Sequence, residues 1–235
     1  MLTQSTALSG SVYPLVRQRP LPVTNDGSTG GRDATAFDRV VRIAGINVSY
    51  LRGAEIFGED EPAEYLYKVM SGSVCTYKIL SDGRRQVSGF YLPGELFGLQ
   101  YSDEYGFSAQ AIRDARIVAI KKRVLMTAAK SDAAVSYQLL LLTALELARV
   151  QNRVLLLAKS AQERVVGFLL EMAVRLPSGK SIRLPMLRQD IADYLGLTIE
   201  TVSRTLKSLQ KLSAIDVSTR HIVLRDRSAL HRLNG

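Results

Sequence analysis

Residues 190–209, DIADYLGLTIETVSRTLKSL, decide the fold of this chain. Apolar residues recur at helical spacing on both sides of one interruption, Gly196, where glycine permits the left-handed backbone of a tight turn. Thr198 then follows as a side-chain cap for a second helix. The stretch predicts a helix-turn-helix rather than an ordinary helical hairpin. The residues expected on the inner faces are Ile191, Ala192, Leu195, Val202, Leu206 and Leu209, with Leu197 filling the corner.

The second helix of this motif carries three polar residues on one face. Glu200, Ser203 and Arg204 are spaced i, i+3, i+4, opposite Val202 and Leu206. In a helix-turn-helix this helix enters the major groove, where arginine donates to guanine, glutamate accepts from cytosine and serine contacts a base or a thymine methyl. The alternative is a surface ion pair between Glu200 and Arg204, contributing only about 0.2–0.5 kcal/mol. Within a helix-turn-helix, the sequence favours base reading.

Residues around this face are candidates for contacts to the DNA backbone. Such contacts position a protein on DNA and make its binding salt-dependent, but they do not distinguish one DNA sequence from another. Residues 215–226, IDVSTRHIVLRD, predict two short strands and a turn at Ser218-Thr219, which is a wing with Arg220 and His221 at its tip. The predicted phosphate contacts are Arg188, Gln189, Thr198, Thr201, Lys207 and Arg220.

Composition agrees with a nucleic-acid-binding C-terminal part. The formal net charge is +9, and twelve Lys or Arg against seven Asp or Glu follow Ser160. Cys75 is the only cysteine, so a disulfide within the chain, a cysteine zinc site and a cysteine-ligated iron–sulfur cluster are excluded. His221 and His231 are too isolated to suggest a metal site. We expect no catalysis, because no paired carboxylates, nucleophile–base set or phosphate-cradling loop occurs.

The N-terminal half divides into an arm and a strand-rich region. Residues 1–35 are rich in Ser, Thr, Gly and Pro and predict a mobile arm, followed by a short amphipathic helix at 37–46. Short β-branched and aromatic runs separated by glycine turns fill residues 54–120. They predict a small antiparallel roll within a domain at 36–130. Cys75 lies in one of these strands, as a packed thiol or as a redox switch.

A long helix is predicted at 131–159, capped by Ser131 or Asp132. Its apolar residues recur at alternating steps of three and four, the spacing of a coiled-coil seam. Leu139, Leu142, Leu145 and Leu155 add a second apolar flank, so one side of the helix can cover the roll and the other side requires a partner chain. The alternative is a helix buried entirely within one chain. The predicted dimer interface is Leu140, Thr143, Leu147, Val150, Val154 and Leu157.

The remaining prediction concerns residues 160–235, a winged helix-turn-helix domain. It begins with a helix at 161–176, whose inner face carries Val165, Phe168, Leu169 and Met172, followed by a turn and strand at 177–186. No apolar stretch looks long enough to cross a bilayer, because Glu146 and Arg149 interrupt the longest one. No secretory signal is evident at the N-terminus. We expect a cytoplasmic protein that does not contact membranes.

The order of these parts, with MSGSV at 70–74, PGELFG at 93–98 and GLTIETVSR at 196–204, resembles the Crp/Fnr family of bacterial transcription regulators. The resemblance covers residues 40–235, and ETVSR is most similar to the FixK group. It implies an α+β fold: an N-terminal antiparallel β-roll that is cyclic-nucleotide-binding-like, a long dimerisation helix and a C-terminal winged helix-turn-helix. It also implies a homodimer on a TTGAT-N4-ATCAA palindrome. Arg204 would read guanine, Glu200 cytosine and Ser203 thymine; the cyclic-AMP-responsive branch has glycine at the position of Ser203.

Two departures from the family pattern bear on regulation. The arm has no cysteines, so an oxygen-sensing iron–sulfur cluster is not expected. Leu99 and Gln100 follow Gly98, where the family's nucleotide pocket has a glutamate for the ribose, and Phe107 precedes Ser108 where it has an arginine for the phosphate. A phosphate without a cationic partner is costly to bury, so we expect no cyclic nucleotide and no cofactor.

The resemblance to FixK implies activity without an effector and control through abundance. The expected function is activation of genes used at low oxygen or in nitrogen metabolism, with RNA polymerase as a partner. The acidic loop at 58–64, GEDEPAE, is either solvated or a polymerase contact. An alternative is an effector-gated Crp-like regulator whose roll binds a nucleotide or another small ligand. A third is a structural nucleoid protein without sequence preference.

Overall fold

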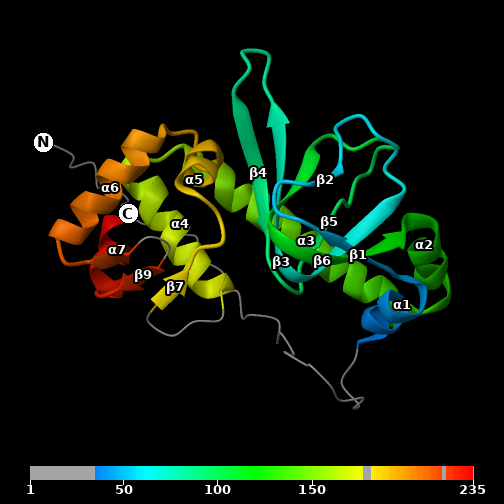
Figure 1. The fold of residues 1–235 in the computed structure, drawn as a ribbon. Coiled ribbons are helices and arrows are strands. Elements are labelled where there is room, and N and C mark those ends of the chain that lie inside the picture. The colour runs from blue at the N-terminus through cyan, green and yellow to red at the C-terminus, as the bar shows by residue number, and fades with distance from the viewer. Residues whose placement is uncertain (1–34, 177–180, 219–220, 235) are drawn as a thin grey trace, which may run out of the picture.

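The protein consists of a β-roll and a helix-turn-helix unit joined by a long helix (Figure 1). The structure, a computed structural model, describes residues 35–176, 181–218 and 221–234. Nearly all of the predicted arm therefore lies outside the described residues. The α+β fold predicted from the sequence is confirmed, with an antiparallel roll followed by helices and a small second sheet.

The roll is built from six antiparallel strands in the order β1-β6-β3-β4, with β2 beside β6 and β5 beside β3. Its core holds Val69, Val74, Phe97 and Ile117, which are almost fully buried. The strands are β1 (Ile46–Tyr50), β2 (Glu55–Phe57), β3 (Tyr65–Ile79), β4 (Arg85–Tyr91), β5 (Leu96–Phe97) and β6 (Ser108–Lys121).

One predicted break in the roll is not a break. Ser71-Gly72 is one of the glycine positions expected to separate short strands, but β3 runs through it with register shifts against β6. Gly72 has φ +82°, and a Cβ there would lie 2.1 Å from the carbonyl oxygen of Asp114. The glycine therefore lets a long strand bulge around its neighbour instead of ending it.

Two helices flank the roll before the long one begins. Helix α1 (Ala36–Ala44) matches the predicted amphipathic helix and starts at a capping box between Thr35 and Asp38. Helix α2 (Lys122–Ser131) was not predicted, because no side chain caps its first turn and its ends carry no glycine or proline. Asp132 ends it and caps the next helix by accepting from the Ala134 N–H at 2.8 Å.

The long helix α3 (Ala133–Leu157) has the two faces that the sequence predicted, with one exception. Leu139, Leu142 and Leu145 are half-buried and line a cavity against the roll, which Val150, Val154 and Leu157 of the predicted seam also line. Leu155, predicted on the same flank, is 66% exposed and does not share the burial of these three leucines. The predicted seam is solvent-exposed at Leu140, Thr143, Leu147, Val150 and Val154, and half-buried at Leu157.

Helix α3 also corrects the prediction about membranes. By length and composition alone it is apolar enough to cross a bilayer. The sequence argument relied on Glu146 and Arg149 as interruptions, but two charges are not enough to exclude a span of this length. These two side chains form an ion pair with each other at 3.3 Å, and Arg149 also pairs with Glu95 of the roll.

The C-terminal unit is a three-helix core with a small sheet against it. The sheet has the order β7-β9-β8, and all its pairs are antiparallel. Helix α7 was not predicted from the sequence; Asp226 caps it by accepting from the Ala229 N–H. The elements are α4 (Ala161–Arg175), β7 (Ser181–Arg183), α5 (Arg188–Leu195), α6 (Ile199–Lys211), β8 (Ile215–Ser218), β9 (His221–Leu224) and α7 (Arg227–Leu233).

Gly196 lies in the turn between α5 and α6 with φ +62°. A Cβ there would meet only ordinary contacts, so an alanine would be strained by the backbone rather than by crowding. We expect Gly196→Ala to lower the free energy of unfolding by about 1 kcal/mol, measured by urea titration. Gly106→Ala is the matched control, because its Cβ would enter open space without a positive φ. Equal effects of the two substitutions would contradict this reading of the turn.

Candidate nucleic-acid interface

The two helices α5 and α6 are held in a fixed relation by a shared core. All six predicted inner residues, Ile191 to Leu209, are buried. The Leu197 N–H donates to the Ala192 carbonyl at 3.0 Å across the turn. Thr198 caps α6 as predicted, accepting from the Thr201 N–H at 3.2 Å. Helix α6 is therefore presented as a rigid element with its outer face free of the core.

The outer face of α6 carries the three predicted base-reading residues. Glu200 and Arg204 are exposed and Ser203 is half-exposed. Glu200 and Arg204 form no ion pair in the described part of the chain, so the surface pair weighed as the alternative is not present in the structure. The guanidinium of Arg188 donates to the Ser203 hydroxyl at 3.4 Å. A cation from the start of α5 thus lies directly beside the predicted reading face.

Five of the six residues predicted to contact phosphate lie within the described residues, on α5, on α6 or at the N-cap of α6. Arg188, Gln189 and Lys207 are exposed. The Gln189 amide is engaged with Asp193 at 2.6 Å, and the hydroxyls of Thr198 and Thr201 are 3.1 Å apart. These three polar groups help to order the motif as well as being available at its surface. Arg220, at the predicted wing tip, lies outside the described residues.

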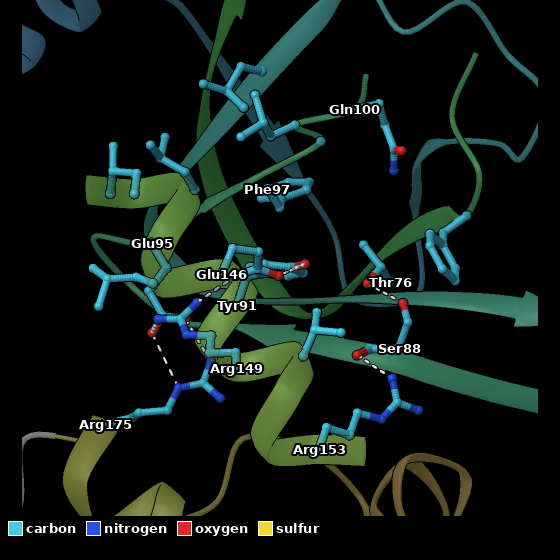
Figure 2. Close-up of a pocket in the computed structure, with 18 of the residues that line it drawn as sticks. Thr76, Ser88, Tyr91, Glu95, Phe97, Gln100, Glu146, Arg149, Arg153 and Arg175 are labelled. Atoms are coloured by element: carbon cyan, nitrogen blue, oxygen red, sulfur yellow. Dashed lines mark hydrogen bonds and ion pairs between the residues drawn. The ribbon is translucent and has the colours of Figure 1, made fainter. Parts of the chain in front are cut away.

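A cavity of about 550 Å³ lies between the roll and α3. Leu99, Gln100 and Phe107 line it, at the places where the family pattern requires a carboxylate and a cation. The polar groups in its wall are largely bonded to one another: the hydroxyls of Thr76 and Ser88 are 2.7 Å apart (Figure 2). The residues present do not fit a cyclic nucleotide.

Two of the three arginines in the cavity wall are neutralised by the protein itself, whereas the third, Arg153, donates to two backbone carbonyls of β4. Glu95 lies 2.7 Å from Arg149 of α3 and 2.8 Å from Arg175 of α4, as Figure 2 shows. Burial alone would raise the pKa of Glu95, but the two arginines outweigh it and hold that pKa below its usual value. One carboxylate therefore ties the roll, the long helix and the C-terminal unit together.

This ion cluster makes stability depend on pH. A depressed pKa means that Glu95 contributes stability above its unfolded value, near pH 4.3, and loses it as the pH falls through the folded value. The free energy of unfolding of the wild-type protein should fall between pH 7 and pH 3.5, partly because Glu95 loses its advantage. In Glu95→Gln we expect this fall to be smaller by about 1 kcal/mol, measured by urea titration at both pH values. Glu64→Gln, which removes an exposed carboxylate without an ion pair among the described residues, should leave that fall unchanged.

Cys75 is fully buried in β3. Burial raises the pKa of its thiol to about 12, although the neighbouring Arg85 favours the thiolate. A thiol that stays protonated and shielded reacts slowly with oxidants, so the packed reading of Cys75 is supported over the redox switch. The sulfur also accepts a hydrogen bond from Arg85 Nη2 at 3.1 Å.

Sequence reasoning missed the charged contacts that join the roll to the C-terminal unit. Arg85 of β4 contacts Asp190 and Asp193 of α5, and Glu95 contacts Arg175. A signal was present for the first of these. Asp190 and Asp193 are spaced i, i+3 and adjoin the inner face of α5, where a carboxylate requires a cation from elsewhere.

These features define a class: a helix-turn-helix DNA-binding transcription regulator attached to a cyclic-nucleotide-binding-type roll. A Crp-like helix-turn-helix domain model matches residues 163–233, and a cyclic nucleotide-binding domain model matches residues 47–132. The chain belongs to the Crp/Fnr family of transcription regulators, and within it is FixK-like.

Individual relatives support this assignment. The chain is 46% identical over 204 residues to the nitrogen fixation regulation protein FixK of Azorhizobium caulinodans, covering 84% of this chain and 82% of that protein. It is 31% identical to the fumarate and nitrate reduction regulatory protein of Vibrio cholerae, over 78% of this chain and 76% of that protein. The structure of FixK2 from Bradyrhizobium japonicum matches with a TM-score of 0.79 and 46% identity, over 82% of this chain and 98% of that one.

Proposed function

We propose that the protein is a homodimeric transcription activator that binds a TTGAT-N4-ATCAA-type palindrome without an effector. The exposed face of Glu200, Ser203 and Arg204 on α6 carries the proposal. Arginine donates to guanine O6 and N7, glutamate accepts from cytosine N4, and serine lies between them at the right spacing to approach a thymine. The cation of Arg188, beside Ser203, favours the approach of a phosphate.

The dimer is supported by the exposed seam of α3. Leucine and valine side chains are exposed at seam positions along four turns, and the heptad spacing matches a partner helix of the same sequence. A second copy is the occupant that also explains a palindromic target, because two-fold protein symmetry is mirrored in the DNA. We therefore assign the seam from Leu140 to Leu157 to the dimer interface rather than to a membrane.

Independence from an effector is supported by the cavity wall. Of the three arginines that could attract an anion, Arg149 and Arg175 are already paired with Glu95, and Arg153 is hydrogen-bonded to backbone carbonyls of β4. A phosphate entering the cavity would have to displace that buried carboxylate, with a large desolvation cost. The internal ion cluster thus takes the place of a ligand in joining the roll to α4.

The remaining parts of the proposal follow the FixK relatives. We infer divisions at 1–35, 36–130, 131–159 and 160–235, a cytoplasmic location, and activation through RNA polymerase of genes for low oxygen or nitrogen metabolism. We also infer from these relatives that the protein acts by binding DNA and not as an enzyme. Within the acidic loop, Glu59 pairs with Lys78 at 2.5 Å, which favours a structural use of that carboxylate.

The deciding experiment is unbiased selection of bound DNA with purified, ligand-free protein. The expected result is a two-fold symmetric TTGAT-N4-ATCAA-type motif at physiological salt. No preference over random DNA would point to a nucleoid protein instead. A motif recovered only after addition of a small molecule would point to an effector-gated regulator.

The second candidate, an effector-gated regulator, is favoured by the size of the cavity. Its volume of about 550 Å³ is within the range of small-molecule sites. We expect calorimetry with cyclic AMP and cyclic GMP at millimolar concentration to give no saturable heat, because Arg149 and Arg175 are paired with Glu95 and both Nη atoms of Arg153 already donate to backbone carbonyls of β4. Saturable binding of either nucleotide would favour the second candidate.

A further inference from the structure

The hairpin formed by β3 and β4 reaches beyond the roll to the first helix of the DNA-binding motif. Arg85, at the start of β4, donates through Nη1 to Asp190 at 2.9 Å and to Asp193 at 3.1 Å. Both aspartate side chains are only 12% exposed, and that of Arg85 is 24% exposed. One guanidinium therefore neutralises two carboxylates on α5 in a largely dry contact.

The guanidinium is itself held in place by the roll. Its Nη2 donates to the sulfur of Cys75 at 3.1 Å, and its carbon lies 4.7 Å from the centre of the Tyr77 ring. The neighbouring Gln86 donates to the carbonyl of Asp193 at 2.5 Å. These directional contacts fix both the distance and the angle between β4 and α5.

An orientation set at α5 is passed on to the reading helix. Asp190 accepts from the Leu187 N–H at 2.8 Å, so the bridge holds the first turn of α5. Ala192, Leu195 and Val202 are fully buried between α5 and α6, which leaves the two helices no room to move separately. The covalent link to α3 is short, but a linker alone does not fix a rotation.

A second ion pair, between Glu95 and Arg175, also joins the roll to this unit, but it holds α4 and not α5. The rings of Phe90 and Tyr194 lie 5.1 Å apart, and Arg113 donates to the Pro185 carbonyl at 3.1 Å. Apolar packing tolerates small rotations better than a guanidinium shared between two carboxylates does. Among the contacts made to α5 itself, the Arg85 bridge is therefore the one most sensitive to the angle of that helix.

We propose that Arg85 is a positioning residue, which fixes the reading helix relative to the roll and so sets the half-site spacing that the dimer accepts. This inference rests on the proposed function. One base pair of spacer shifts a half-site by about 3.4 Å and rotates it by about 35°. A C-terminal unit held at a fixed angle binds poorly to a half-site that is shifted in this way, whereas a unit that is free to rotate still binds it.

The first test compares Arg85→Gln with Arg84→Gln on the DNA motif selected by the wild-type protein. Arg84 is the matched control, because Arg84→Gln makes the same change in charge at a side chain that is 76% exposed and, within the described residues, pairs with Asp82 alone. The spacer is varied by one base pair in each direction. We expect Arg85→Gln to reduce the ratio of affinities for the wild-type and altered spacers about tenfold. Such a change corresponds to a reading helix that holds the wild-type orientation about one tenth of the time. Arg84→Gln should retain wild-type discrimination.

Asp193→Asn tests the bridge from its other side and keeps the shape of the side chain. It changes the net charge in the opposite direction to Arg85→Gln, so an equal loss of spacer discrimination in both variants cannot come from net charge. The double variant should lose no more than Arg85→Gln alone, because Arg85 is a member of both ion pairs and its loss already breaks the pair with Asp193. A spacer profile unchanged from wild type in both single variants overturns the proposal.

Hydrogen exchange of α5 gives a readout that does not need a DNA site. Arg85→Gln and Asp193→Asn should increase amide exchange in Arg188–Leu195, whereas Arg84→Gln should not. If the wild-type protein selects no two-half motif, the proposed function fails, and exchange alone decides the role of Arg85. Unchanged exchange in both bridge variants would then reject it.

Discussion

Replacing Arg204 with alanine is expected to weaken binding to the palindrome by about 1–3 kcal/mol, or roughly 5- to 150-fold in affinity. Arg204 is exposed on α6 and is not committed to an ion pair with Glu200 in the structure. Its planar guanidinium therefore remains available for two hydrogen bonds to one guanine. The variant should lose discrimination at that base pair while preference at the other positions is retained. Binding to every single-base variant of the half-site measures this directly.

Lys207→Ala provides the comparison for Arg204→Ala. Lys207 is exposed on the same helix, but it is assigned to the phosphate backbone. Its loss should weaken all sequences about equally and lower the slope of log affinity against log salt by about one unit per half-site. A specificity profile that Arg204→Ala leaves unchanged would reject the assignment of this arginine to a base.

The parts of the fold that the sequence predicted are those decided by local chemistry. Gly196 marks the turn because few other residues adopt its positive φ, and Thr198 caps α6 because its hydroxyl is one turn from an unpaired N–H. The buried faces of α4, α5 and α6 followed from helical spacing. The antiparallel roll followed from short strands between glycine turns, although its strands are longer than the pattern suggested.

The parts that the sequence did not reveal depend on residues distant in the chain. Arg85 and Asp190 are 105 positions apart, and Glu95 and Arg175 are 80 apart. No periodicity links such residues, because their contact is decided by how the roll and the C-terminal unit pack. Helix α2 was missed for another reason: it lacks a side-chain cap at its start. Its only buried residue is Leu125, so tertiary contact rather than pattern holds it.

The sequence was sufficient to propose the exposed face of α6 as a DNA-reading surface, but it did not reveal the ion cluster around Glu95. Glu200, Ser203 and Arg204 were located by spacing alone, and the structure leaves them on an outer face. The departures at Leu99 and Phe107 predicted the loss of a nucleotide clamp. They gave no indication that Glu95 would supply an internal anion instead, which requires knowing that α3 and α4 converge on the loop after β4.

The substitution Val150→Asp is expected to have the largest effect, the loss of the dimer. Val150 lies near the middle of the exposed seam of α3 and is 52% exposed, so a single subunit should still fold. In a two-fold dimer the substitution would bring two carboxylates together inside an apolar seam, with both repulsion and desolvation opposing assembly. Sedimentation should show a monomer. Affinity for the palindrome should fall about 10²- to 10⁴-fold, because each half-site is then bound without its partner.

Leu155→Asp is the matched control for Val150→Asp. Leu155 is an apolar residue of the same helix and is 66% exposed, but it lies outside the heptad seam. The same charge placed there should leave the sedimentation profile and the DNA affinity close to wild type. A dimer that survives Val150→Asp but dissociates with Leu155→Asp would move the interface to the other exposed face. A dimer that survives both would place the interface away from α3, and circular dichroism of each variant would exclude unfolding as the cause of any loss.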